Sequence, residues 1–152
     1  MPFSFFQKVI VRIKKLHPDA TIPTFGTKNS AGFDIYSNEN YELKPGETHA
    51  FSTGIAMEIP EGKACFIWDR SGMGFKGIHR FSGLIDSDYR GEFKIILYNH
   101  TIKDYEIKKG DRICQAVIQN YYQPEFKEVD ELSETERGKG SFGSTGKWIN
   151  FL

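Results

Sequence analysis

The stretch that organises the chain is residues 82–92, with the sequence SGLIDSDYRGE. It contains the apolar pair Leu84-Ile85 and then a polar segment, and residues 93–98 (FKIILY) follow with an apolar side chain at every second position. Such alternation predicts a strand with one face on a core. Asp88 and Gly91 begin and end a segment with typical turn chemistry. We therefore predict a tight hairpin.

The predicted turn carries more functional groups than a hairpin requires. Two carboxylates, a tyrosine and an arginine lie between Asp86 and Arg90. A plain hairpin needs only the glycine and an Asx residue. Two interpretations are open: a solvated turn with an internal aspartate–arginine pair, or a site in which these side chains face a ligand.

Short runs of β-forming residues continue on both sides of the hairpin. Residues 6–16 alternate apolar and basic side chains, which is typical of an edge strand. One helical turn is expected near residues 70–75. Many short strands without an amphipathic helix predict an all-β sandwich or barrel. Further strands are predicted at residues 30–37, 48–58, 64–68, 104–107 and 112–122.

The composition is that of one globular domain. The chain has 152 residues, 39% of them hydrophobic, which is long enough to bury a core. Lys and Arg total 20, and Asp and Glu also total 20, so the basic excess of a general nucleic-acid-binding protein is missing. We expect no nucleic-acid partner. A small anion held by a few local cations is compatible with this balance.

The two cysteines, Cys65 and Cys114, lie in apolar runs and are predicted to be buried free thiols in a reducing compartment. Their spacing does not fit a zinc site. The sequence has no apolar run long enough for a membrane span and no signal-peptide pattern. We expect a cytoplasmic, or otherwise soluble intracellular, protein without a membrane partner.

The C-terminal residues differ in composition from the rest of the chain. They are rich in glycine, hydroxyl groups and charge, so we predict a domain at 1–132 followed by a flexible arm at 133–152. Arg137 and two lysines flank the glycines, and such a segment can wrap a phosphate chain. The alternative is a solvated tail. Phe142 favours a role in binding, because an unanchored tail seldom carries an aromatic residue.

Five separated segments follow one another as in a known protein family. They are residues 31–37 (AGFDIYS), 70–73 (RSGM), 83–92 (GLIDSDYRGE), 110–115 (GDRICQ) and 137–146 (RGKGSFGSTG). In this order they resemble the five motifs of the homotrimeric dUTPases, the deoxyuridine triphosphate nucleotidohydrolases. The departures include Asp69, where the family often has proline, Cys114 in place of alanine and Ser141 in place of glycine.

The resemblance implies a jelly-roll-like β fold and a homotrimer with active sites shared between subunits. It also implies hydrolysis of dUTP to dUMP and pyrophosphate with Mg²⁺. Asp86 would then activate a water for attack on the α-phosphorus, since an aspartate is ionised at neutral pH and can accept a proton. Asp34 would lie near the water shell of the metal, with an Asx turn or an internal ion pair as the alternative.

The resemblance also implies a set of substrate contacts. Uracil specificity would come from backbone groups of the hairpin, because cytosine reverses the hydrogen-bonding pattern at N3 and C4. The residues implied are Arg70, Ser71, Gly72 and Gln115 for the phosphates, Gly83, Leu84, Ile85 and Lys94 for the base, Tyr89 for the deoxyribose, and Arg137, Phe142 and Gly143 of the arm for the bound nucleotide.

Two other functions are open. A dCTP deaminase has the same fold, and ammonia release from dCTP would identify it. A nucleotide-sensing or protein-binding module without catalysis is the second alternative. The presence of Asp86, Arg70, Gln115 and Arg137 argues against an inactive enzyme.

Overall fold

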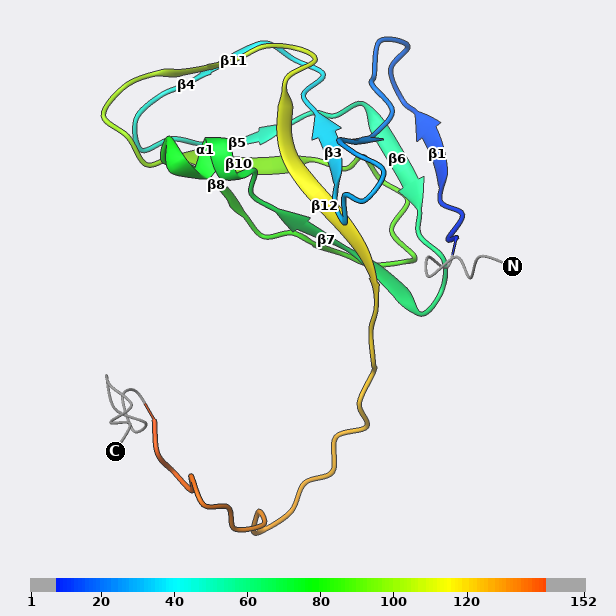
Figure 1. The fold of residues 1–152 in the computed structure, drawn as a ribbon, viewed down its shortest axis with the longest axis vertical. Coiled ribbons are helices and arrows are strands. Elements are labelled where there is room, and N and C mark those ends of the chain that lie inside the picture. The colour runs from blue at the N-terminus through cyan, green and yellow to red at the C-terminus, as the bar shows by residue number, and fades with distance from the viewer. Residues whose placement is uncertain (1–7, 142–152) are drawn as a thin grey trace. The chain divides into compact units, whose positions relative to one another are not determined.

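The computed structural model describes residues 8–141. Contacts within the chain define two units, Met1–Tyr122 and Gln123–Leu152. The first unit holds every strand and the short helix of the described residues (Figure 1). The boundary at 132/133 and the flexibility of the arm stay predictions. No helix within residues 8–141 is long and apolar enough to cross a membrane.

The largest sheet contains five antiparallel strands in the order β2-β3-β12-β7-β9. The longest ladder joins β7 and β12, with Trp68 opposite Gln115 at one end. This register brings the loop after β7 beside the beginning of β12 (Figure 1). The strands are β2 (Thr24–Phe25), β3 (Phe33–Tyr36), β7 (Lys63–Trp68), β9 (Leu84–Ile85) and β12 (Arg112–Asn120).

A second sheet has the order β5-β10-β8, and two strand pairs, β1-β6 and β4-β11, complete the fold. The helix α1 (Ser71–Phe75) follows β7, where one helical turn was expected. The architecture is the predicted all-β, jelly-roll-like sandwich. The remaining strands are β1 (Arg12–Lys15), β4 (Tyr41–Leu43), β5 (Thr48–Phe51), β6 (Ile55–Glu58), β8 (Ile78–Phe81), β10 (Ile95–Asn99) and β11 (Tyr105–Ile107).

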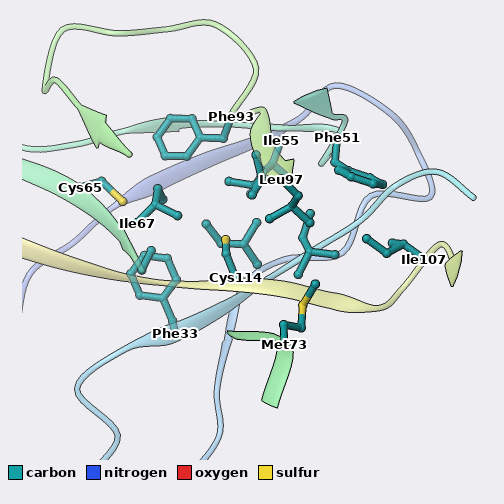
Figure 2. Close-up of a cluster of buried hydrophobic side chains, with 14 of the residues drawn as sticks. Phe33, Phe51, Ile55, Cys65, Ile67, Met73, Phe93, Leu97, Ile107 and Cys114 are labelled. Atoms are coloured by element: carbon teal, nitrogen blue, oxygen red, sulfur yellow. The ribbon is translucent and has the colours of Figure 1, made fainter. Parts of the chain in front are cut away.

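Side chains from several strands form a continuous apolar core (Figure 2). Ile95 and Leu97 of β10 are buried, as is Phe93 just before this strand. Cys65 of β7 and Cys114 of β12 enter the same core as free thiols. The one-sided burial predicted for the segment after the turn is therefore confirmed, and so is the burial of both cysteines.

The predicted hairpin is wrong. The short strand β9 pairs with β7, whereas β10 pairs with β5 and β8. The Tyr89 N–H donates to the Asp86 carbonyl (3.3 Å), so the turn begins at Asp86 rather than at Asp88. Arg90 donates to the carbonyls of Ser87 (2.6 Å) and Tyr89 (3.0 Å) and forms no pair with an aspartate of the turn. The segment connects two sheets instead of closing one.

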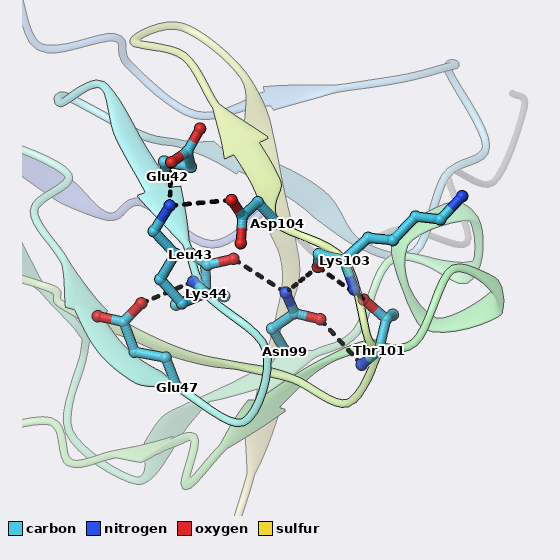
Figure 3. A network of polar contacts seen from close by, with 8 residues as sticks. All are labelled: Glu42, Leu43, Lys44, Glu47, Asn99, Thr101, Lys103 and Asp104. Carbon is cyan, nitrogen blue, oxygen red and sulfur yellow. Dashed lines mark hydrogen bonds and ion pairs between the residues drawn. The ribbon is translucent and has the colours of Figure 1, made fainter.

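A buried polar network joins β4 to the segment after β10 (Figure 3). Asn99 is fully buried, and its Nδ2 donates to the carbonyls of Leu43 (2.9 Å) and Lys103 (2.8 Å). Its Oδ1 accepts the Thr101 N–H (2.9 Å). Each polar atom of the buried amide is thus satisfied, which limits the cost of its desolvation. The network fixes the chain that leads into β11, and β11 lines the larger cleft described below.

Candidate active site

The five-stranded sheet brings Asp34, Arg70 and Arg112 together at one end. Asp34 lies on β3, directly opposite Gln115 of β12. Its Oδ1 lies 3.1 Å from Arg70 Nε, and its Oδ2 lies 3.3 Å from Arg112 Nη1. The Asp34 side chain is only 14% exposed, and a carboxylate that is largely removed from water is stabilised by pairing with cations. Asp34 therefore makes an internal ion pair, the alternative considered for it; a water-mediated metal contact stays a prediction.

Arg70 ends the extended chain after β7, and α1 begins at the next residue. Its Nη1 also donates to the Arg112 carbonyl (3.1 Å), so two contacts fix the guanidinium. Ser71 and Gly72 are exposed in the first turn of α1. A Cβ placed on Gly72 would have no atom of the described residues within 4 Å. The fold of the single chain therefore does not require glycine there.

Gln115 is oriented by the same loop. Its Nε2 donates to the Asp69 carbonyl (2.9 Å), and its Oε1 would lie 3.1 Å from a Cβ on Gly32. Gly32 thus leaves room for the amide, a role that the sequence did not assign to it. The structure brings three of the residues predicted for phosphate or metal, Asp34, Arg70 and Gln115, to one end of the sheet.

A cleft of about 280 Å³ opens beside the two arginines. Asp111 accepts the Lys108 N–H through Oδ2 (2.8 Å) and closes the turn before β12. Two guanidinium groups at the cleft make it suited to an anion. The lining residues are Arg70, Met73, Tyr105, Ile107, Gly110, Asp111, Arg112 and Ile113.

A second, smaller cleft of about 50 Å³ gathers the residues predicted for the base. All four of Gly83, Leu84, Ile85 and Lys94 line it. Arg80, which the sequence did not single out, lines it as well; the other members are Ile67, Phe81, Ser82, Ile95 and Ile96. The two clefts have no lining residue in common.

Asp86 and Tyr89 follow directly after the strand that lines the smaller cleft. Asp86 is exposed, and its carboxylate has no hydrogen-bond or ion-pair partner among residues 8–141. The Tyr89 hydroxyl donates to the Glu92 carbonyl (3.0 Å), and the side chain is 45% exposed. Both side chains are therefore available to a ligand, and neither is part of the core.

The arm residues belong to the second unit of the chain. Arg137 Nε donates to the Gly140 carbonyl (3.1 Å), and the Gly140 N–H donates back to the Arg137 carbonyl (3.0 Å). Gly138 adopts a positive φ of 50° within this turn. Phe142 and Gly143, also predicted for the arm, lie outside the described residues.

The family model for dUTPase matches residues 18–146. The chain belongs to the dUTPase family. It is 53% identical over 140 residues to the deoxyuridine 5'-triphosphate nucleotidohydrolase of Nautilia profundicola, covering 90% of this chain and 99% of that protein. Identity to the Clostridioides difficile protein of the same name is 44% over 139 residues, covering 90% and 97%.

Solved dUTPase structures have the same fold. The dUTPase of Staphylococcus bacteriophage 80alpha with dUPNHPP superposes with a TM-score of 0.86 at 32% identity, covering 91% of this chain and 99% of that one. A variant dUTPase of phage phi11, described as coordinating a structural Mg(II) ion, gives a TM-score of 0.78 at 28% identity, covering 83% and 100%. The chain therefore has a dUTPase fold.

Proposed function

We propose that this chain hydrolyses dUTP to dUMP and pyrophosphate. The observation that carries the proposal is the position of Asp86 in a chain of the dUTPase family. An exposed carboxylate with no partner among residues 8–141 follows directly after β9, whose residues line the smaller cleft. Such a group can accept a proton at neutral pH.

In the proposed reaction, the Asp86 carboxylate takes a proton from a water as the water oxygen attacks the α-phosphorus. The bond between that phosphorus and the oxygen bridging to the β-phosphate breaks, and pyrophosphate leaves with the electron pair. A positioned base of this kind contributes roughly 10²–10⁴ in rate. The remainder comes from orientation and from charge stabilisation by the cationic groups.

The phosphates would bind at the end of the sheet where Arg70 and Gln115 lie. Arg70 Nη2 makes no hydrogen bond with residues 8–141, so this part of the guanidinium can reach a phosphate while Nε and Nη1 hold the side chain. Ser71 and Gly72 add a hydroxyl and an open backbone. Arg137 of the arm would pair with the γ-phosphate.

The base would bind in the smaller cleft, where Gly83 to Ile85 present backbone groups beside Lys94. Tyr89 would lie against the deoxyribose and leave no room for a 2′-hydroxyl. Phe142 would stack on the base from the arm, with Gly143 allowing a close approach.

Magnesium would enter with the triphosphate. No group of three or more His, Cys, Asp or Glu within residues 8–141 is arranged to hold a metal ion, and both Asp34 oxygens contact guanidinium groups. These residues do not fit a protein cage, but they fit an ion held by phosphate oxygens and waters, as Mg²⁺ prefers. The bound ion would neutralise phosphate charge. Asp34 would contact this ion through a water molecule.

We also propose a homotrimer with shared sites. The phosphate-side and base-side clefts have no lining residue in common, which is compatible with a nucleotide bound between copies.

The test measures pyrophosphate release from dUTP, dCTP, dTTP and UTP in parallel, together with ammonia release from dCTP. We expect turnover of dUTP alone at a substantial rate. Asp86→Asn should lower turnover by at least about 10²-fold with dUTP binding largely retained, because the amide keeps the shape but cannot take the proton.

Asp88→Asn is the matched control, with the same change at an exposed carboxylate two residues away. It should stay near wild-type activity. Near wild-type turnover of Asp86→Asn would exclude Asp86 as the base, and ammonia release from dCTP would indicate a deaminase.

A further inference from the structure

Arg80 connects the phosphate-side loop to the base-side cleft within one chain. It lies on β8, and its backbone N–H donates to Oδ1 of Asp69 (2.7 Å). Its guanidinium lies 5.6 Å from the centroid of the Trp68 ring, and its Nη1 donates to the Ser82 carbonyl. Arg80 also lines the smaller cleft together with Gly83. The side chain is thus held by the protein and holds Ser82 in turn.

Asp69 is itself fixed in place. Its backbone carbonyl accepts the Gln115 amide (2.9 Å), and its Oδ2 lies 3.3 Å from Nδ1 of His79. The carboxylate therefore joins the loop after β7 to β8. Proline, which the family often has at this position, offers no side-chain acceptor for these contacts.

Ser82 needs support because its backbone conformation is unfavourable. Its φ of 61° is the only positive value for a non-glycine residue within residues 8–141, and Gly83 has a φ of 134°. Such conformations persist where surrounding contacts determine them, and they occur frequently at ligand sites. The Gly83 carbonyl accepts the Ile67 N–H (2.8 Å), while Arg80 binds the Ser82 carbonyl. The segment is therefore held from two sides.

These contacts fix the peptide bond between Ser82 and Gly83 in one orientation. In a planar trans peptide the N–H points away from the carbonyl, so the bond from Arg80 also restrains the direction of the N–H of Gly83, a residue that lines the cleft. Loss of that bond would remove one restraint on the rotation of this peptide, and a rotated peptide would present an acceptor in place of a donor. Uracil and cytosine differ by this exchange at N3 and C4, so the orientation affects which base is accepted.

We propose that Arg80 is a positioning residue that selects uracil over cytosine by holding the Ser82–Gly83 peptide, and that Asp69 positions Arg80. The inference deepens the proposed function and rests on it. Arg80 acts through the backbone, so its loss should change base selectivity more than it changes the chemical step.

The test compares Arg80→Met and Arg80→Lys with the wild type. Methionine keeps the unbranched apolar stem of the side chain but has no donor for Ser82, whereas lysine keeps a cationic donor group without the planar fork. The control is Arg12→Met, which removes an exposed arginine of β1 that is paired only with Glu58 among residues 8–141. kcat/KM is measured for dUTP and dCTP, and calorimetry measures binding of dUMP and dCMP.

We expect the dUTP-to-dCTP ratio of kcat/KM to fall at least about tenfold in Arg80→Met, the size of effect of one misplaced hydrogen bond. The dUMP-to-dCMP binding ratio should fall with it. Arg80→Lys should lie between Arg80→Met and the wild type, and Arg12→Met should keep the wild-type ratio.

Asp69→Ala tests the second half of the inference. It should lower the same ratio. The double variant Asp69→Ala/Arg80→Met should lower the logarithm of that ratio by less than the two single variants together, because both changes act through one peptide. A wild-type ratio in a folded Arg80→Met protein would overturn the inference; where that variant does not fold, Arg80→Lys decides by the same ratio. If the wild type releases no pyrophosphate from dUTP, the proposed function fails, while dUMP and dCMP binding still tests the selection.

Discussion

At the scale of one residue, Gly91 determines where the Tyr89 ring can lie. A Cβ on Gly91 would clash with the Tyr89 hydroxyl oxygen and would lie only 2.6 Å from Cζ. The hydroxyl donates to the Glu92 carbonyl (3.0 Å), which holds the ring against the glycine. Glycine is therefore needed here for space, and not for the turn geometry inferred from the sequence, because the turn begins at Asp86.

Gly91→Ala should displace the Tyr89 ring, and under the proposed function this reduces the exclusion of the ribose 2′-hydroxyl. We expect the ratio of kcat/KM for dUTP to that for UTP to fall roughly tenfold, the size of effect of small steric changes in a binding pocket. Gly26→Ala is the control, because a Cβ there makes only an ordinary contact with Ser30, at 3.6 Å. An unchanged ratio would show that the position of the Tyr89 ring does not determine the selection of the sugar.

Single residues also show which parts of the candidate site could be predicted from the sequence. The resemblance to the dUTPase motifs implied that Gly83 to Ile85 act together at the base, and the structure places them in one cleft. Arg80 was not predicted, since its contacts depend on Asp69, which lies 11 residues earlier and on another element. No local pattern encodes that pairing.

At the scale of elements, alternation predicted the buried faces but not the pairing partners. The period-two pattern correctly placed Phe93, Ile95 and Leu97 in the core. The hairpin was wrong because strand pairing is non-local, and a turn signal between two strands does not require them to pair with each other. The strands β2, β4 and β8 were not predicted, since two to four residues carry too little alternation to stand out.

The connection between the sheets is held by Glu92, and this contact should make stability depend on pH. Its Oε1 accepts the Ser52 hydroxyl (2.5 Å) and the Gly54 N–H (2.9 Å). Burial alone would raise the pKa of Glu92, but these hydrogen bonds and the charge of Lys94 lower it below the ordinary 4.5. A lowered pKa means stabilisation that is present above pH 4.5 and is lost as pH falls through the folded-state value.

Glu92→Gln should lower the free energy of unfolding by about 1 kcal/mol at pH 7, because a neutral amide replaces a charge-assisted acceptor. The difference from wild type should shrink as the pH falls below 4.5. Denaturant unfolding at several pH values measures it. Glu61→Gln, in the exposed turn after β6, controls for the loss of one charge. If the difference in the free energy of unfolding stayed constant with pH, the stabilisation could not come from the charged form of Glu92.

At the scale of the whole molecule, the proposed trimer would build each site from more than one copy of the chain. Arg70 lines the larger cleft, and Asp86 follows the strand of the smaller one. Under the proposed trimer, a site takes these two residues from different subunits. The fold class could be predicted from sequence, and the comparisons place the chain in the dUTPase family. The assembly stays a prediction, because contacts between copies leave no local pattern in one sequence.

Mixing two inactive variants tests the shared site. Arg70→Ala and Asp86→Asn should each be inactive, and trimers refolded from an equal mixture should recover about a quarter of wild-type activity, since one site in four receives both native residues. Light scattering should report a trimer for every sample. A fully active monomer, or a mixture without recovery, would place both residues in one subunit.

The reactivity of the buried cysteines can report local opening of the fold. Burial raises the pKa of the Cys65 thiol to about 12 and also raises that of Cys114. Because the thiolate is the reactive form, an alkylating reagent should modify these side chains only in molecules whose β7–β12 ladder has opened. The rate of modification then measures the free energy of opening the ladder that ends at Gln115. Under the proposed function, a nucleotide bound at that end should slow the modification, so binding could be followed without any added label.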